Sequence, residues 1–139
     1  MNKKEAIKGA NELSERTKSV MVGSIGAEGY PNVKCMFKAE AQGLKKIWFS
    51  TNTSSKRVAQ FRENPKACVY IVDVEKFMGL MLVGDIEVLE DQNSKQRLWH
   101  NGDEIYYPLG VTDPDYCVLR FTAKWGNYYH GLGNVSFDI

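Results

Sequence analysis

The stretch Ile47–Pro65, IWFSTNTSSKRVAQFRENP, carries most of the information about the fold. Ile47, Trp48 and Phe49 predict the end of an apolar strand, and Pro65 follows a helix that we expect over residues 54–63. Between the two lies a polar turn, Ser50–Ser55, which carries five hydroxyl groups and one amide. A strand, a turn and a capped helix therefore follow one another within 19 residues.

The start of the predicted helix has the chemistry of an anion site. The first N–H groups of a helix are unpaired and carry a partial positive charge, so they attract anions. Lys56 adds a mobile charge, and Arg57 adds a planar fork that can hold a phosphate through two hydrogen bonds. The same residues have a simpler interpretation, in which Ser54 or Ser55 only caps the helix and the two cations are solvated.

Composition limits the classes of protein to which the chain can belong. Its 139 residues predict one domain, residues 1–139, and 43% hydrophobic with 25% charged residues is typical of a globular protein. The net charge of +1 gives no overall attraction for nucleic acid. Apolar runs are short and no signal peptide is recognisable, so we expect a cytoplasmic protein without a membrane segment.

Cysteine and histidine are scattered along the chain. Cys35, Cys68 and Cys117 are far apart and predict buried, reduced thiols without a disulfide or zinc site. His100 and His130 are isolated, so we expect no metal site. No Ser/His/Asp or Cys/His spacing is recognisable, and the catalytic residues stay unknown.

Hydrophobic periodicity predicts a mainly β protein with a few short helices. Gly84 predicts a bulge or a tight barrel bend within its strand, and the run 67–72 predicts a strand buried on both faces. Leu98 and Trp99 are expected to be buried. Six or seven strands joined by short turns, with few helices, favour a small antiparallel barrel. The predicted helices cover residues 3–16, 54–63 and 93–101, and the predicted strands cover 19–25, 30–37, a segment ending at Phe49, 67–72, 79–90, 116–122 and one segment after Trp125.

Four motifs in register resemble those of the pyridoxamine 5′-phosphate oxidase-like FMN-binding split barrels, in the branch of the small bacterial general stress proteins. The first is Phe49-Ser50-Thr51-Asn52 with Ser55-Lys56-Arg57, Gln60 and Asn64-Pro65. The others are Gly29–Lys34, Val83–Val88 and Gly110–Tyr116. The resemblance covers nearly the whole chain after the first helix, and it implies an antiparallel split β-barrel that binds FMN.

The resemblance also implies roles for individual residues. Thr51, Ser55, Lys56 and Arg57 would hold the FMN phosphate, and Ser50 would also belong to the cofactor-binding residues. Lys34 stands where the family usually has Arg and would reach the phosphate or the ribityl chain, while Cys35, Met36 and Phe37 would run along the isoalloxazine ring. Family members are homodimers with the flavin at the interface, and an aromatic residue of the partner, Trp125 or Tyr128, would cover the ring.

Departures from the family pattern narrow the expected function. Gly79 stands near the position of a Gln in true pyridoxamine phosphate oxidases, and their C-terminal Arg-x-His is missing. We therefore expect a flavin-dependent oxidoreductase that passes electrons from NAD(P)H to an unknown small acceptor, and not a true pyridoxamine phosphate oxidase. The alternatives are a non-catalytic flavin-binding stress or sensor protein, and a barrel that binds another small molecule or an oligonucleotide, which the balanced charge disfavours.

Overall fold

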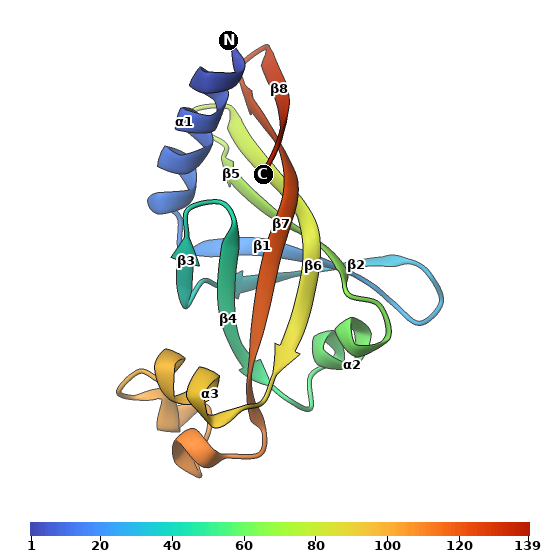
Figure 1. The fold of residues 1–139 in the computed structure, drawn as a ribbon, viewed down its shortest axis with the longest axis vertical. Helices are drawn as coiled ribbons and strands as arrows, with labels where there is room; N and C mark the ends of the chain where they lie inside the picture. The colour runs from blue at the N-terminus through green and yellow to red at the C-terminus, as the bar shows by residue number, and fades with distance from the viewer.

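The computed structural model describes residues 1–139 and consists of eight strands, three α-helices and two short 3-10 turns. The strands form one antiparallel sheet in the order β2-β1-β5-β6-β7-β4-β3, with β8 paired to β7 (Figure 1). The helices are α1 (Lys3–Glu15), α2 (Lys56–Glu63) and α3 (Gln92–Leu98), the 3-10 turns are η1 (Asp103–Ile105) and η2 (Gly110–Thr112), and the strands are β1 (Ser19–Ile25), β2 (Pro31–Phe37), β3 (Glu40–Gln42), β4 (Lys46–Asn52), β5 (Lys66–Asp73), β6 (Met78–Leu89), β7 (Tyr116–His130) and β8 (Gly133–Asp138).

The sheet curls into an open barrel and confirms the predicted split-barrel fold. Strands β1 and β2 cross behind β4, β6 and β7 near the middle of the molecule, and α1 and β8 lie at the end opposite to α3 (Figure 1). The two ends of the sheet order, β2 and β3, do not pair with each other, so the barrel is not closed by a hydrogen-bonded ladder. This gap matters because the candidate site described below lies there.

The main core fills the inside of the curled sheet. In the central strands β5, β6 and β7, alternate residues point inward over much of the strand, as the period of two in a strand requires. On β7, for example, Cys117, Leu119 and Phe121 are fully buried and belong to this core. Helix α1 closes one end with Leu13, which is 1% exposed.

A second, smaller core lies on the other face of β4 and β7. It joins Trp48, Tyr116 and Val118 of the sheet to Leu98 of α3 and to Tyr107 of the following loop. Both faces of β7 are therefore buried near Tyr116, and the loop after α3 is fixed against the sheet.

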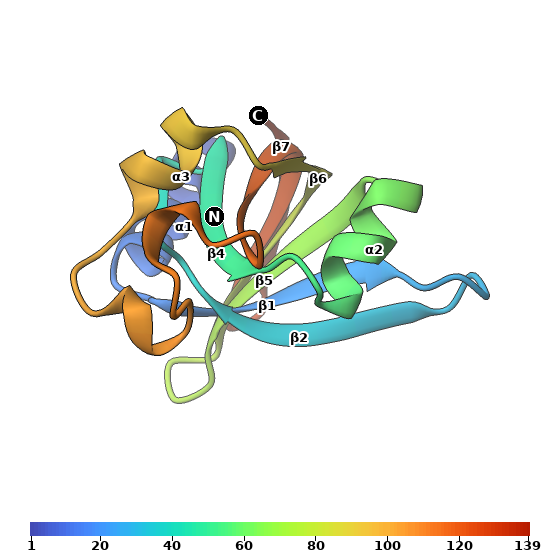
Figure 2. The same ribbon diagram turned by 90° about the horizontal axis from the view of Figure 1, so that it is seen from below.

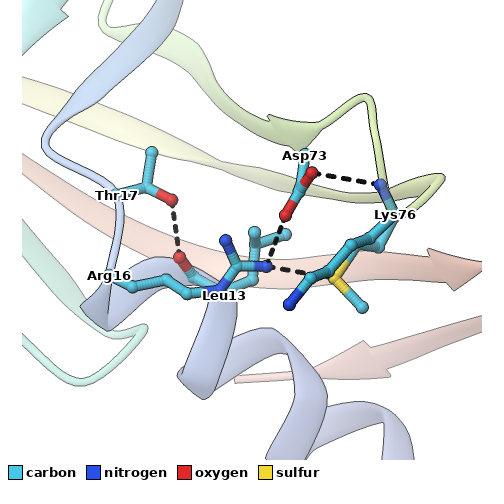
Figure 3. A network of polar contacts seen from close by, with 6 residues as sticks. Leu13, Arg16, Thr17, Asp73 and Lys76 are labelled. Carbon is cyan, nitrogen blue, oxygen red and sulfur yellow. Dashed lines mark hydrogen bonds and ion pairs between the residues drawn. The ribbon is translucent and has the colours of Figure 1, made fainter.

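Helix α1 is also tied to the turn between β5 and β6 by polar contacts (Figure 3). One guanidinium nitrogen of Arg16 lies 2.9 Å from a carboxylate oxygen of Asp73. The other oxygen of Asp73 accepts a hydrogen bond from the N–H of Lys76 at 3.1 Å. These contacts hold the pKa of Asp73 below its usual value, with the Lys76 hydrogen bond as the largest cause.

Gly84 lies at a β-bulge, as predicted. Val83 pairs with Trp125 and Gly84 pairs with Ala123, so Lys124 is the extra residue of β7. A Cβ at position 84 would lie 1.9 Å from the carbonyl oxygen of Thr122, so only glycine fits.

Several details of the sequence analysis were wrong. Strand β7 is one continuous strand through residues 116–130, and β3 was not predicted, because neither feature leaves a clear break or run in the sequence. Strand β5 is buried on one face only: Ala67, Val69 and Ile71 point inward, and their neighbours are partly or fully exposed.

The environments of three other predicted core residues also differ from the sequence analysis. Cys35 is exposed and Cys68 is half-buried, because both lie on the outer face of the sheet, and only Cys117 is buried. Trp99 follows the end of α3 and is half-buried.

None of the helices is long and apolar enough to cross a membrane.

Candidate functional site

A cleft of about 470 Å³ lies between β2, the end of β4 and the loop that follows α3. Strand β2 ends the sheet order on one side, and β4 is next to last on the other, so the curling of the sheet brings them face to face (Figure 2). The cleft therefore occupies the opening of the split barrel. Six residues named from the sequence line it, namely Lys34, Cys35, Met36, Phe37, Ser50 and Thr51.

Strand β2 supplies one wall of the cleft and is open to solvent. Lys34, Cys35 and Phe37 are exposed, and only Met36 turns toward the core, with 8% exposure. Because β2 pairs only with β1, the backbone groups along its other edge are free of sheet partners. This wall therefore offers a cation, apolar side chains and unpaired backbone groups to a ligand.

The turn between β4 and α2 continues from the cleft to the helix. Asp115 holds this turn, since its carboxylate accepts hydrogen bonds from Asn52 Nδ2 at 2.9 Å and from the Ser54 N–H at 2.8 Å. The Thr53 N–H adds a third bond to the Asp115 carbonyl oxygen, also at 2.8 Å. Hydrogen bonding from Ser54, the largest cause, and from Asn52 holds the pKa of Asp115 below its usual value.

Helix α2 begins where the sequence predicted an anion site. Ser55 caps the helix, and its hydroxyl accepts from the Val58 N–H at 3.4 Å. Lys56 is exposed and Arg57 is half-buried. These three residues do not line the cleft itself, and they lie four to six residues beyond Thr51, at the far end of the turn.

Three cations near the cleft lack protein partners. Lys34, Lys56 and Arg57 take part in no ion pair or side-chain hydrogen bond, although five pairs of oppositely charged Lys or Arg and Asp or Glu side chains occur elsewhere. Lys38, which also lines the cleft, differs because its Nζ donates to the carbonyl oxygen of Ser14. Burial lowers the pKa of Lys38, and the charge of Glu15 partly opposes this. Lys38 is therefore bonded to the end of α1, while Lys34, Lys56 and Arg57 have no partner within the protein.

The opposite wall comes from a loop to which the sequence analysis assigned no role. It contributes His100, Asp103, Tyr106 and Tyr107. Tyr107 is 5% exposed and packs on Tyr116 with ring centroids 4.7 Å apart, which anchors the loop. Two adjacent tyrosines in a polar loop were the one sequence signal that could have indicated this wall.

Asp103 shapes the rim of the cleft. Its carboxylate accepts the His100 N–H at 2.8 Å and lies 3.9 Å from His100 Nδ1. Tyr106 is exposed beside it. The rim therefore presents an exposed imidazole and an exposed phenol at the cleft.

The two aromatic residues considered as covers for a ligand ring differ in accessibility. Trp125 is 37% exposed on the outer face of β7, beside the bulge. Tyr128 is 2% exposed and packs against Gly9 of α1, where a Cβ would lie 2.7 Å from its hydroxyl oxygen. Tyr128 is a core residue, so burial excludes it from that role, whereas Trp125 faces away from the protein.

The family model for pyridoxamine 5′-phosphate oxidase matches residues 7–130. The chain belongs to the pyridoxamine 5′-phosphate oxidase family, as the motifs around Ser50–Arg57 indicated. Proteins of this family typically bind flavin and are often dimeric. No protein in the curated comparison matches the chain.

Solved structures show the same fold. The chain is 54% identical to a Clostridium acetobutylicum protein related to general stress protein 26, with a TM-score of 0.89 over 99% of this chain and 97% of that one. General stress protein 26 of Bacillus anthracis shares the fold at 16% identity, with a TM-score of 0.76 over 100% of both chains. A heme-binding protein of Mycobacterium smegmatis does so at 16% identity, with a TM-score of 0.75 over 96% of this chain and 57% of that one.

The side chains around the cleft suit the phosphate of a flavin mononucleotide. The hydroxyl oxygen of Ser50 lies at the cleft, is buried, and makes no hydrogen bond of ordinary geometry within the protein. A phosphate near the turn would also meet the free charges of Lys34, Lys56 and Arg57. The donor set is thus cationic and hydroxyl-rich, as a phosphate requires.

Proposed function

We propose that this protein binds FMN in the cleft between β2 and β4. The observation that supports this most is that six residues named from the sequence line one cleft whose neighbouring cations have no protein partner. A flavin mononucleotide has a flat ring at one end and a phosphate at the other. The open strand β2 at one side of the cleft would receive the ring. The capped helix α2, beyond the other side, would receive the phosphate.

In this proposal, different residues bind the phosphate, the ribityl chain and the ring of FMN. Ser50, Thr51 and Ser55, together with Lys56 and Arg57, surround the phosphate. Lys34 of β2 reaches the phosphate or the ribityl chain, since it lines the same cleft as Thr51. Residues Cys35, Met36 and Phe37 run along the isoalloxazine ring, where the free edge of β2 offers backbone hydrogen bonds.

We propose further that the protein is a homodimer with FMN at the interface. The outer face of the sheet carries several large exposed apolar side chains, which a partner subunit would remove from water. Trp125 of the partner would cover the ring in such a dimer. The exposed side chains are Met21, Val33, Phe37, Val72 and Trp125, with exposures of 41%, 68%, 73%, 40% and 37%.

FMN, when bound, supplies the electron-transfer chemistry, and the protein positions it. Strand β2 holds the ring edge, and the cations compensate the phosphate charge. The loop residues His100 and Tyr106 border the remaining space of the cleft, where a small electron acceptor would meet the ring. The proposed reaction is reduction of such an acceptor with electrons from NAD(P)H, in a cytoplasmic protein that needs no nucleic acid or membrane partner.

The first experiment is an absorption spectrum of the purified protein before and after incubation with FMN and gel filtration. Flavin bands that stay with the protein would support the proposal, and a colourless protein would contradict it. A parallel incubation with hemin tests the heme alternative, because one protein of the same fold binds heme. A retained Soret band without retained flavin would contradict FMN as the ligand and support heme in its place.

Turnover separates an oxidoreductase from a non-catalytic flavin-binding stress or sensor protein. The loaded protein is mixed with NADH or NADPH and, in turn, with quinones, nitro compounds and oxygen. Steady oxidation of the nicotinamide with any acceptor supports the enzyme. Bound flavin without turnover in every combination supports the non-catalytic alternative.

A further inference from the structure

The segment Gly110–Tyr116 was recognised in the sequence, but the proposed function gives it no role. In the structure this segment leads into β7 and lies against the turn between β4 and α2. Three hydrogen bonds connect them: two to the carboxylate of Asp115 and one to its carbonyl oxygen. The carboxylate and carbonyl oxygens of Asp115 therefore accept one hydrogen bond from each of residues 52, 53 and 54.

Asp115 is itself held by a buried polar frame. The carboxylate of Asp113, which is 5% exposed, accepts the N–H of Asp115 at 2.9 Å and that of Leu109 at 3.1 Å. Lys95, which is 4% exposed, donates from Nζ to the carbonyl oxygen of Asp113 at 3.0 Å. The Tyr116 hydroxyl donates to the carbonyl oxygen of Lys95 at 2.8 Å. Because each of these groups is paired inside the protein, the frame fixes where the Asp115 carboxylate lies.

The turn held by Asp115 joins the two halves of the anion site. Thr51, on one side, lines the cleft, and Ser55, on the other, caps α2 directly before Lys56 and Arg57. The distance between the cleft hydroxyls and the helix cations therefore depends on the path of residues 52–54. Without the Asp115 carboxylate, the N–H of exposed Ser54 and the amide of Asn52 would turn to water, and this path would be free to vary.

We infer that Asp115 is a positioning residue for the phosphate of the bound flavin. It acts through Ser54 and Asn52 and does not need to touch the ligand. This inference rests on the proposed function and adds a specificity to it: Asp115 sets the preference for a phosphorylated flavin over the same flavin without phosphate. Riboflavin has the same ring and ribityl chain as FMN, so it reports on the cleft without the phosphate.

A direct electrostatic role of Asp115 predicts the opposite result. A carboxylate near a phosphate repels it, so removal of the charge alone would tighten FMN binding. A positioning role predicts weaker FMN binding after the same change. The sign of the effect therefore separates the two roles.

The test compares the affinities of FMN and riboflavin in full-length Asp115→Ala and Asp115→Asn, measured by quenching of flavin fluorescence. We expect the ratio of FMN to riboflavin affinity to fall on the order of tenfold in Asp115→Ala, by analogy with the loss of metal affinity when the hydrogen-bond partner of a metal ligand is removed. The drop should be smaller in Asp115→Asn, because Asn keeps an oxygen that accepts the Ser54 N–H. Riboflavin affinity alone should stay within about twofold.

Asp73→Asn is the matched control. Asp73 likewise accepts a backbone N–H in a turn, but this turn joins β5 to β6 and does not border the cleft (Figure 3). The control should leave the affinity ratio unchanged even where it lowers the melting temperature.

The outcomes distinguish the inference from the proposed function. Wild-type protein that binds neither flavin overturns the proposed function and this inference with it. Wild-type protein that prefers FMN, with an unchanged or higher ratio in both Asp115 variants, overturns the inference alone. A lower ratio in Asp73→Asn as well would show a loss of general stability and also overturn it. Should Asp115→Ala not fold, the ratio in Asp115→Asn decides.

Discussion

At the residue scale, Gly84 has the strictest requirement in the molecule. We expect Gly84→Ala to lower the free energy of unfolding by roughly 1–3 kcal/mol, because the added methyl group would meet the Thr122 carbonyl oxygen and force the bulge to shift. Urea denaturation measures this change. Gly133→Ala is the control, since its Cβ would first meet the flexible end of Met1 at 3.1 Å. Equal stability of the two variants would contradict the bulge geometry.

Lys56 and Arg57 carry the residue-scale prediction for the proposed ligand. A charge-assisted contact is worth roughly 1.5–3 kcal/mol, so removal of one should weaken FMN about ten- to a hundredfold. We expect this for Lys56→Ala and a larger loss for the double Ala variant, measured by flavin fluorescence. Lys66→Ala, an exposed lysine outside the cleft, should have no effect. Unchanged FMN affinity in the double variant would show that the phosphate lies elsewhere.

The residues around the cleft differ in how far the sequence predicts them. Lys34 and Thr51 were identifiable because a known motif stands around each of them. Tyr106 and Tyr107 were not, since only tertiary packing on Tyr116 brings their loop to the cleft. The role of Asp115 was equally hidden, because its partners lie 61 and 63 residues away in the sequence.

At the scale of elements, helix α1 shows how a local pattern becomes a stabilising contact. Its apolar residues recur at helical spacing, and this pattern predicted its limits to within one residue. In the structure Asn2 caps the helix, and its side chain accepts the Glu5 N–H at 2.8 Å. The sequence did not show what α1 covers. In the structure it closes one end of the barrel, beside β8 (Figure 1).

We expect Leu13→Ala to lower the free energy of unfolding by about 2–5 kcal/mol, because it removes a fully buried side chain at this contact. Thermal or urea denaturation measures the loss. Lys8→Ala, on the exposed face of the same helix, should change stability by less than about 0.5 kcal/mol. A small loss for Leu13→Ala would mean that α1 contributes little to the closure of the barrel.

At the scale of the whole molecule, acid should destabilise the fold through its carboxylates. Hydrogen bonds from backbone N–H groups lower the pKa of Asp73 and Asp91, and the bonds of Ser54 lower that of Asp115. A carboxyl group with a lower pKa in the folded state stabilises that state above its unfolded pKa, near 4, and this stabilisation disappears as the pH falls through the folded value.

The free energy of unfolding should therefore decrease steadily as the pH falls below about 4. Urea denaturation at a series of pH values from 7 to 3 measures this trend. The decrease should be shallower in Asp73→Asn and Asp115→Asn, which lack one of the titrating groups. A wild-type slope that neither variant reduces would assign the acid sensitivity to other carboxylates.

The proposed dimer gives a second prediction at this scale. Val33→Lys places a charge on the exposed outer face of β2 without changing a residue that lines the cleft, so we expect it to favour the monomer. Sedimentation equilibrium measures the state of assembly. Leu132→Lys is the control, because that fully exposed residue lies in the turn between β7 and β8. A wild-type monomer would contradict the proposed interface.

The continuous strand β7 has a consequence for how the chain acquires its structure during synthesis. β7 pairs with β4, β6 and β8, so it is the only strand that joins the β3–β4 hairpin to the rest of the sheet. Before residues 116–130 emerge from the ribosome, the nascent chain therefore holds two pieces of sheet that no strand pairing joins. Both pieces have open edges and exposed apolar faces. Cooperative folding must wait for nearly the entire chain to emerge, and a nascent chain stalled before that point would be a natural client for a chaperone.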